Sequence, residues 1–145
     1  MKKYVITGLA IAMLCTMVTG AESKKQNKNS KAEDAAVKAA EATLKLIDEG
    51  KYAESWKESA VFFKKAVKQE QWIAAMKQAR KPFGKLVSRK VLTKQYMTKL
   101  PGAPAGEYVV IQFKTSFEKK KDAVETFTPM LDKDSKWRMS GYYIK

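Results

Sequence analysis

The chain has 145 residues, with 29 Lys and Arg against 15 Asp and Glu, no histidine and a single cysteine, Cys15. The absence of histidine excludes Ser–His–Asp and Cys–His catalysis and removes a common ligand of zinc, copper and haem. Acid–base chemistry would have to use Asp, Glu, Lys or Tyr. We therefore expect no metal and no cofactor, and we assign no catalytic residue.

The chain begins with the pattern of a secretory signal peptide. Lys2 and Lys3 precede an uncharged apolar run over 4–18, too short for the roughly 20 residues that a membrane-spanning helix needs. Small residues follow, and cleavage after either Gly20 or Ala21 fits them, with Ala21 preferred. We expect export to the periplasm or the exterior, with contact to the membrane only through this segment; an uncleaved anchor is the alternative.

The only cysteine lies within that apolar run. Lipidation would need Leu-x-small-Cys, but the bulky Leu14 directly precedes Cys15, and the run continues through Met17 and Val18. We expect Cys15 to be removed with the leader rather than lipidated. The mature chain then cannot form a disulfide.

The charge of the mature chain bears on its partners. Without Lys2 and Lys3 it has 27 basic and 15 acidic residues, a net charge of +12. Basic residues cluster at 64–68, 80–90 and 119–121. Such a field attracts anionic envelope polymers or acidic lipid surfaces, although a solvated surface is the simpler interpretation. Nucleic acid is not expected, because export is expected and no nucleic-acid-binding motif is present in the sequence.

The pattern divides the chain into three parts: a signal peptide at 1–21, a polar spacer at 22–30 and a single domain at 31–145. The spacer contains no apolar residue and is expected to be disordered. The domain is long enough for one hydrophobic core.

Helices are expected in the first half of the domain. Apolar residues recur at helical spacing in three stretches, 37–47, 52–67 and 72–79. Ser30 or Asp34 could cap the first helix, and Gly50 suits its end. Trp56 lies on the second stripe, where core packing is favoured over a ligand cage.

Strands are expected in the second half, at 86–97, 108–117, 123–131 and 137–144. A breaker-rich loop at 100–106 and charged turns at 118–122 and 132–135 separate them. Short connections favour antiparallel neighbours. The fold class is therefore α+β, with N-terminal helices packed on a curved, cone-like, four-stranded antiparallel sheet.

Arg89 is the residue whose placement the pattern leaves open. Alternation puts it on one face with Val87 and Val91, and both faces of this strand carry two apolar residues and a cation. We predict that Arg89 faces the helices, because β-branched neighbours suit a packed face and guanidinium tolerates burial. A buried Arg89 needs a carboxylate, with Glu125 the first candidate and Asp48 or Glu49 the second. A fold-holding ion pair is favoured over an anion-binding cone.

Several motifs together resemble a known family. They are Tyr52, Ser55-Trp56, Phe62-Phe63, Trp72, Arg80, Pro82-Phe83-Gly84 and Arg89, followed by LPGAPAGEYVVIQFKTSF, ETFTPMLDKD and WRMSGYYIK. This pattern, from about Ala32 to Lys145, resembles the bacterial family catalogued as domain of unknown function 4019. The resemblance implies a small exported protein without an established activity. The layout is also similar to nuclear-transport-factor-2-like cones, by architecture only.

Three functions remain open. The first is a non-catalytic envelope module that binds a small ligand, a peptide or an anionic polymer, with Arg89, Glu125, Trp56 and Arg80 as candidate binding residues. The second is an isomerase- or dehydratase-like enzyme with a carboxylate base inside the cone, for which Glu125 is the only acid flanked by strand-like apolar residues. The third is a purely structural or stress-related partner protein, which a homodimer through the exposed sheet face would suit.

Overall fold

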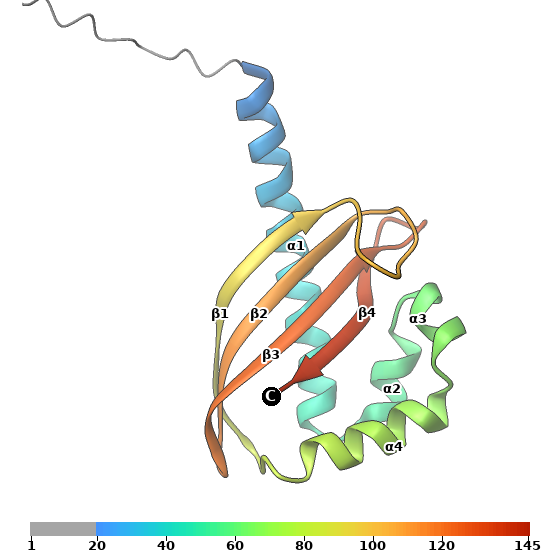
Figure 1. The fold of residues 1–145 in the computed structure, drawn as a ribbon, viewed down its shortest axis with the longest axis vertical. Coiled ribbons are helices and arrows are strands. Elements are labelled where there is room, and N and C mark those ends of the chain that lie inside the picture. The colour runs from blue at the N-terminus through green and yellow to red at the C-terminus, as the bar shows by residue number, and fades with distance from the viewer. Residues whose placement is uncertain (1–19) are drawn as a thin grey trace, which may run out of the picture.

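The computed structural model describes residues 20–145, so the expected signal peptide and Cys15 lie outside the described residues, apart from Gly20 and Ala21. Four helices precede four strands (Figure 1). The helices are α1 (Gly20–Asp48), α2 (Tyr52–Lys57), α3 (Val61–Ala66) and α4 (Gln69–Arg80). The strands are β1 (Leu86–Met97), β2 (Tyr108–Phe117), β3 (Lys120–Leu131) and β4 (Trp137–Ile144). Within this part of the chain, no helix is both long and apolar enough to cross a membrane.

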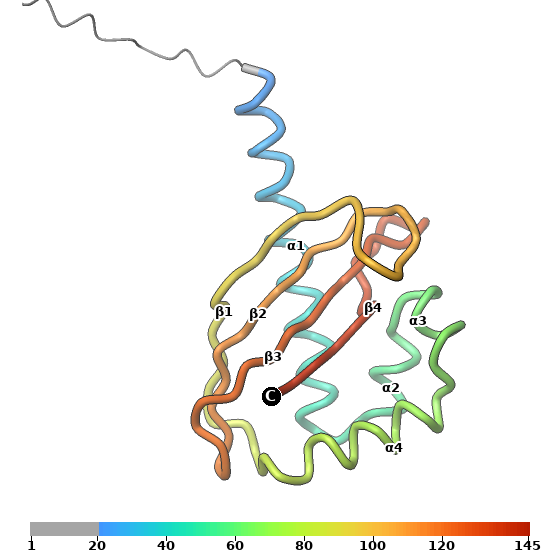
Figure 2. Tube along the Cα trace, viewed as in Figure 1, coloured from blue at the N-terminus to red at the C-terminus, as the bar shows by residue number. Residues whose placement is uncertain are grey.

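Helix α1 is longer than expected. The segment 22–30, expected as a disordered spacer, forms its first turns, which project beyond the sheet (Figure 2). The side chains of this segment are almost all exposed. Lysine, glutamine and glutamate are good helix formers, so these turns can extend a helix that is nucleated by packing further along. The packed part presents Ala36, Ala40, Leu44 and Ile47, all buried, at helical spacing.

The second expected helix is divided into α2 and α3. Ser59 turns its hydroxyl back to the Ser55 carbonyl, at 2.8 Å, and Ala60 becomes extended, with φ −58° and ψ 148°. The Ala60 amide then donates to the carbonyl of Met139 on β4, at 2.9 Å. A bond to the sheet therefore replaces one helical turn, which a continuous apolar stripe does not reveal.

The sheet has the order β1-β2-β3-β4, with every neighbouring pair antiparallel. It curves around α1, and the helices pack on one of its faces, called here the inner face (Figure 1). The edge strand β1 has register shifts at Val87 and Leu92, where it carries one residue more than β2. These bulges shift the alternation of side chains between the two faces.

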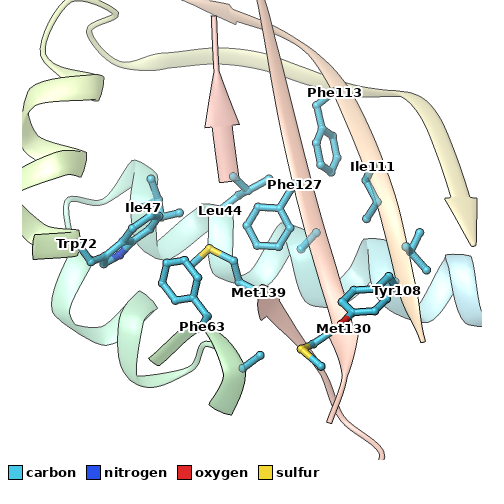
Figure 3. Packing of buried hydrophobic residues seen from close by; sticks show 14 of the residues in the cluster. Leu44, Ile47, Phe63, Trp72, Tyr108, Ile111, Phe113, Phe127, Met130 and Met139 are labelled. Carbon is cyan, nitrogen blue, oxygen red and sulfur yellow. The ribbon is translucent and has the colours of Figure 1, made fainter. Parts of the chain in front are cut away.

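The core lies between the inner face and the helices (Figure 3). Alternate β2 side chains, including Val109, Ile111 and Phe113, are buried against α1, in keeping with the period of two of a strand. Phe63 and Trp72 meet edge to face, with ring centroids 5.3 Å apart. These contacts attach α3 and α4 to the remainder of the core.

Candidate functional site

Arg89 points to the inner face and binds Glu125, as predicted. Its Nε donates to Glu125 Oε2 at 2.6 Å, and its Nη2 donates to Oε1 at 3.1 Å. Strand register brings Arg89 and Glu125 close together. Arg89 lies opposite Thr115 on β2, and Glu125 lies opposite Phe113, the next β2 residue on the same face. The carboxylate of Glu125 is fully buried, with 0% of its surface exposed.

Asp48, the last residue of α1, is the second partner of Arg89. Nη1 of Arg89 donates to Asp48 Oδ2 at 2.7 Å, and Nη2 donates to Oδ1 at 3.0 Å. Glu49, the other candidate, forms a surface ion pair with Lys51 instead. Both second candidates sit at the end of the same helix, but only Asp48 is turned toward the sheet.

Arg80, at the end of α4, completes a pair of buried guanidinium groups. Its Nη2 donates to Asp48 Oδ1 at 2.8 Å, its Nη1 reaches Glu125 Oε1 at 3.5 Å, and its guanidinium carbon lies 4.6 Å from the centroid of the Phe117 ring. Of the four candidate binding residues, the structure therefore brings Arg80, Arg89 and Glu125 together. Trp56 is apart from them, and its indole donates to the Val67 carbonyl at 2.8 Å.

Two hydroxyl groups that the sequence reasoning missed complete the site. Thr115 donates to Glu125 Oε2 and Tyr142 donates to Glu125 Oε1, both at 2.6 Å. Thr115 alternates along β2 with Ile111 and Phe113, so its proximity to an inward Arg89 could have been inferred from strand register. The position of Tyr142 could not be inferred in this way. Its hydroxyl contacts Arg80 and Glu125 only because the curvature of the sheet brings β4 toward α4. We call Asp48, Arg80, Arg89, Thr115, Glu125 and Tyr142 the charge cluster.

The electrostatics of the charge cluster keep its donors protonated. Burial opposes the charge on Arg89, but its bonds to Asp48 and Glu125 outweigh burial and raise its pKa above the ordinary value. Burial also opposes the charge on Arg80, yet its interactions with Tyr142 and Asp48 raise its pKa. Burial and the adjacent Glu125 carboxylate raise the pKa of Tyr142, so this phenol stays neutral and donates.

The charge cluster contains two cations, two carboxylates and two neutral hydroxyls. Its formal charges cancel, and within residues 20–145 no buried side-chain nitrogen or oxygen lacks a hydrogen-bond partner. In the same residues, no group of three or more His, Cys, Asp or Glu side chains could hold a metal ion. A saturated, neutral network of this kind holds six elements of the fold together, α1, α4 and all four strands.

Glu125 does not line either of two surface hollows that border the sheet. A hollow of about 240 Å³ between α1 and β1 is lined by Asp48 and Arg89, but not by Glu125. A larger one of about 840 Å³ lies over α3 and the 132–134 turn, away from the charge cluster. Glu125 lines neither hollow, so neither gives a substrate access to its carboxylate.

Arg89 faces inward as predicted, but Val87 and Val91 are not packed as that prediction required. Val87 is 65% exposed and Val91 is 41% exposed. Val87 occupies the first bulge, and β1 is an edge strand that the helices cover only in part. The inward position of Arg89 is stabilised by the charge cluster rather than by its β-branched neighbours.

The outer face of the sheet, which the helices leave uncovered, carries three lysines in a line across the strands, Lys90, Lys114 and Lys145, which we call the lysine row. Lys90 lies directly opposite Lys114, and their chain neighbours Arg89 and Thr115 point inward, so both lysines point outward. Val124 follows Lys114 across the sheet, and its backbone pairs with that of Lys145 through two hydrogen bonds of 2.9 and 3.1 Å. Like charges placed directly opposite one another destabilise a sheet.

A second row crosses the outer face beside the lysines. It consists of Thr93, Gln112, Thr126 and Tyr143, each directly opposite the next. The Thr93 hydroxyl donates to Gln112 Oε1 at 3.2 Å, which confirms that these two side chains share a face. Tyr143 is 62% exposed. The basic clusters noted in the sequence included Lys90, but Lys114 and this row were missed, because only strand register brings them together.

Comparison with known proteins gives one family match. Neither the curated proteins nor the solved structures yielded a match to the chain, so the likeness to nuclear-transport-factor-2-like cones stays an architectural expectation. The model of one family covers residues 39–142, from within α1 to β4 and including the whole charge cluster. The chain belongs to that family, which is described as Protein of unknown function (DUF4019).

Proposed function

We propose that the protein is a non-catalytic module of the cell envelope that binds an anionic polymer through the outer face of its sheet. The observation that carries the proposal is the like-charged pair Lys90–Lys114 on an exposed face. Such a pair costs stability in the free protein. A polyanion lying across the face would turn that repulsion into attraction.

The distribution of charge supports the proposal. The charge cluster contains two positive and two negative residues, so its charges cancel. The net charge of +12 that the chain carries without Lys2 and Lys3 therefore comes from residues outside the cluster. Lys90, Lys114 and Lys145 are all exposed. The proposed binding surface is therefore the outer face, not the interior that holds Arg89, Glu125 and Arg80.

The carboxylate-enzyme alternative is less well supported. A catalytic base needs a free lone pair and a path for substrate, whereas both oxygens of Glu125 already accept hydrogen bonds from an arginine and a hydroxyl. A homodimer through the outer face would bring two lysine rows together, which like charge disfavours. Both remain measurable alternatives.

Export and localisation are part of the proposal and rest on the pattern of the first 21 residues. We expect the exported protein to begin near Ala21 or Glu22 and to carry no lipid. Intact mass of the exported fraction tests this. A mass that retains Cys15 with added acyl chains would replace a soluble module with a lipid-anchored one.

The test of binding uses polyphosphate and polygalacturonate as probes, measured by calorimetry at low and high salt. We expect affinity to fall with salt, because the contacts are between exposed charges. Lys90→Glu/Lys114→Glu should weaken binding roughly tenfold or more, since each lysine near an anionic surface contributes about 1 kcal/mol. The matched control is Lys38→Glu/Lys77→Glu, which changes net charge equally at exposed positions of α1 and α4. Equal losses in the two double variants, or no binding at low salt, would reject the proposal.

A further inference from the structure

We infer that the anionic polymer is an acidic polysaccharide, held along the two rows of the outer face, with Tyr143 stacking on a sugar ring. This inference rests on the proposed function and adds the chemistry of the ligand. The lysine row supplies charge alone, whereas the neighbouring row supplies neutral hydrogen-bonding groups and an aromatic ring. A ligand that uses both rows must carry both acidic groups and hydroxyls.

The geometry places the two rows at a distance that one chain of linked sugars can bridge. Lys114 and Gln112 are two residues apart on β2, which corresponds to about 7 Å along a strand. Each row crosses the four strands, a width of about 14 Å at ~4.8 Å per strand. An acidic sugar residue could therefore place its carboxylate at the lysines and its hydroxyls over the neighbouring row.

The side chains of the second row suit sugar hydroxyls. Thr93 and Thr126 each offer a hydroxyl that can donate and accept, and Gln112 offers an amide with both donors and an acceptor. Tyr143 lies opposite Thr126 at the end of the row, with most of its surface exposed. A tyrosine ring has an apolar face that can cover the apolar face of a sugar, and its hydroxyl remains available to solvent or ligand.

An anionic lipid surface fits these features less well. Binding to a lipid surface requires cations and an apolar or aromatic edge that enters the headgroup layer. The outer face curves around the helices and is therefore convex (Figure 2), so a flat bilayer would touch only part of it. The hydroxyl and amide row would also have no specific partner there.

The experiment compares four probes on the purified full chain: polygalacturonate, polyphosphate, neutral dextran, and vesicles of phosphatidylcholine with phosphatidylglycerol. Polygalacturonate should bind more tightly than polyphosphate at equal concentration of charge, and dextran should bind weakly at most. Tyr143→Ala should weaken polygalacturonate binding about fivefold, the factor that corresponds to ~1 kcal/mol for an aromatic contact, and leave polyphosphate unchanged. Tyr143→Phe, which keeps the ring, should stay within about twofold of the parent protein.

The outcomes separate the two proposals. If polyphosphate binds as tightly as polygalacturonate and Tyr143→Ala affects both equally or neither, the polysaccharide inference is overturned while anion binding stands. If vesicles bind more tightly than polygalacturonate, the partner is a lipid surface and the inference is again overturned. If neither polyanion responds to Lys90→Glu/Lys114→Glu, both proposals are overturned. Thermal melts of each variant confirm that the fold is retained, which is expected because all of these side chains lie on the outer face.

Discussion

Replacing Glu125 with glutamine tests whether the charge cluster stabilises the fold. The amide has the shape of the carboxylate but can accept through only one of its two positions. At the Oε2 position its NH₂ would face Arg89 Nε, and at the Oε1 position it would face Arg89 Nη2, so a donor meets a donor in either orientation. The change also leaves two arginines with one carboxylate. Removing one partner of a buried ion pair costs about 3–5 kcal/mol, and we expect Glu125→Gln to lie in that range.

The companion change is Arg89→Met, which leaves Asp48 and Glu125 with only Arg80. We expect a similar single loss, and a melting temperature lower by roughly 12–20 °C in each case, at ~4 °C per kcal/mol for a domain of this size. The double variant should lose less than the sum by about 1–3 kcal/mol, because Arg80 and Asp48 still balance one another. Urea unfolding followed by tryptophan fluorescence, to which the buried Trp72 contributes, measures all three. Additive losses, or a cost below about 1 kcal/mol for Glu125→Gln, would show that the charge cluster does not act as one unit.

Three further predictions concern other parts of the molecule. Lys90→Glu should stabilise the fold by about 0.2–1 kcal/mol, because it turns a cross-strand repulsion with Lys114 into attraction; an unchanged urea midpoint would mean that the two ammonium groups do not interact. Burial and a hydrogen bond to Glu107 raise the pKa of Tyr96 to about 12, above its unfolded value of about 10. The stability that this phenol contributes is therefore complete below about pH 10 and lost as pH rises toward 12, and Tyr96→Phe should flatten that part of a stability–pH curve; a parallel curve would contradict the assignment. Gly84→Ala should cost more stability than Gly102→Ala. Both glycines have positive φ, but only a Cβ added at Gly84 would lie close to Glu118, 3.0 Å from its Oε2 and 3.2 Å from its Cβ. Equal melting temperatures of the two variants would refute that clash.

The limits of most strands could be predicted because they depend on local chemistry. Glycine, proline and charged turns bound β1, β2 and β4, and the predicted ranges agree with the structure at both ends. The third strand begins at Lys120 rather than 123, since charged residues beside the turn of a hairpin continue the ladder as easily as they form a turn. The extra residue at each β1 bulge left no mark in the sequence, because neither Val87 nor Leu92 is a glycine or a turn former.

The charge cluster could be predicted only in part for a related reason. An inward Arg89 demanded a carboxylate, and strand alternation limited the choice, so its pairing with Glu125 followed from burial energetics. Arg80 and Tyr142 lie at the end of a helix and near the end of a strand, and their positions depend on how far α4 runs and how strongly the sheet curves. Local pattern carries no information on either quantity. The lysine row on the outer face was not predicted for the same reason, because the register across four strands is a property of the assembled sheet.

The span of the charge cluster along the chain has a consequence for how the protein folds. Its arginine bonds join residues from 32 to 62 positions apart, from the end of α1 to β4. Closing loops of this length costs chain entropy before any bond is formed, so the cluster is expected to assemble late, after local helices and hairpins. Interactions that form after the rate-limiting step slow unfolding rather than speed folding. The buried charges would then act chiefly on the rate of unfolding, lengthening the lifetime of the folded molecule more than they speed its formation.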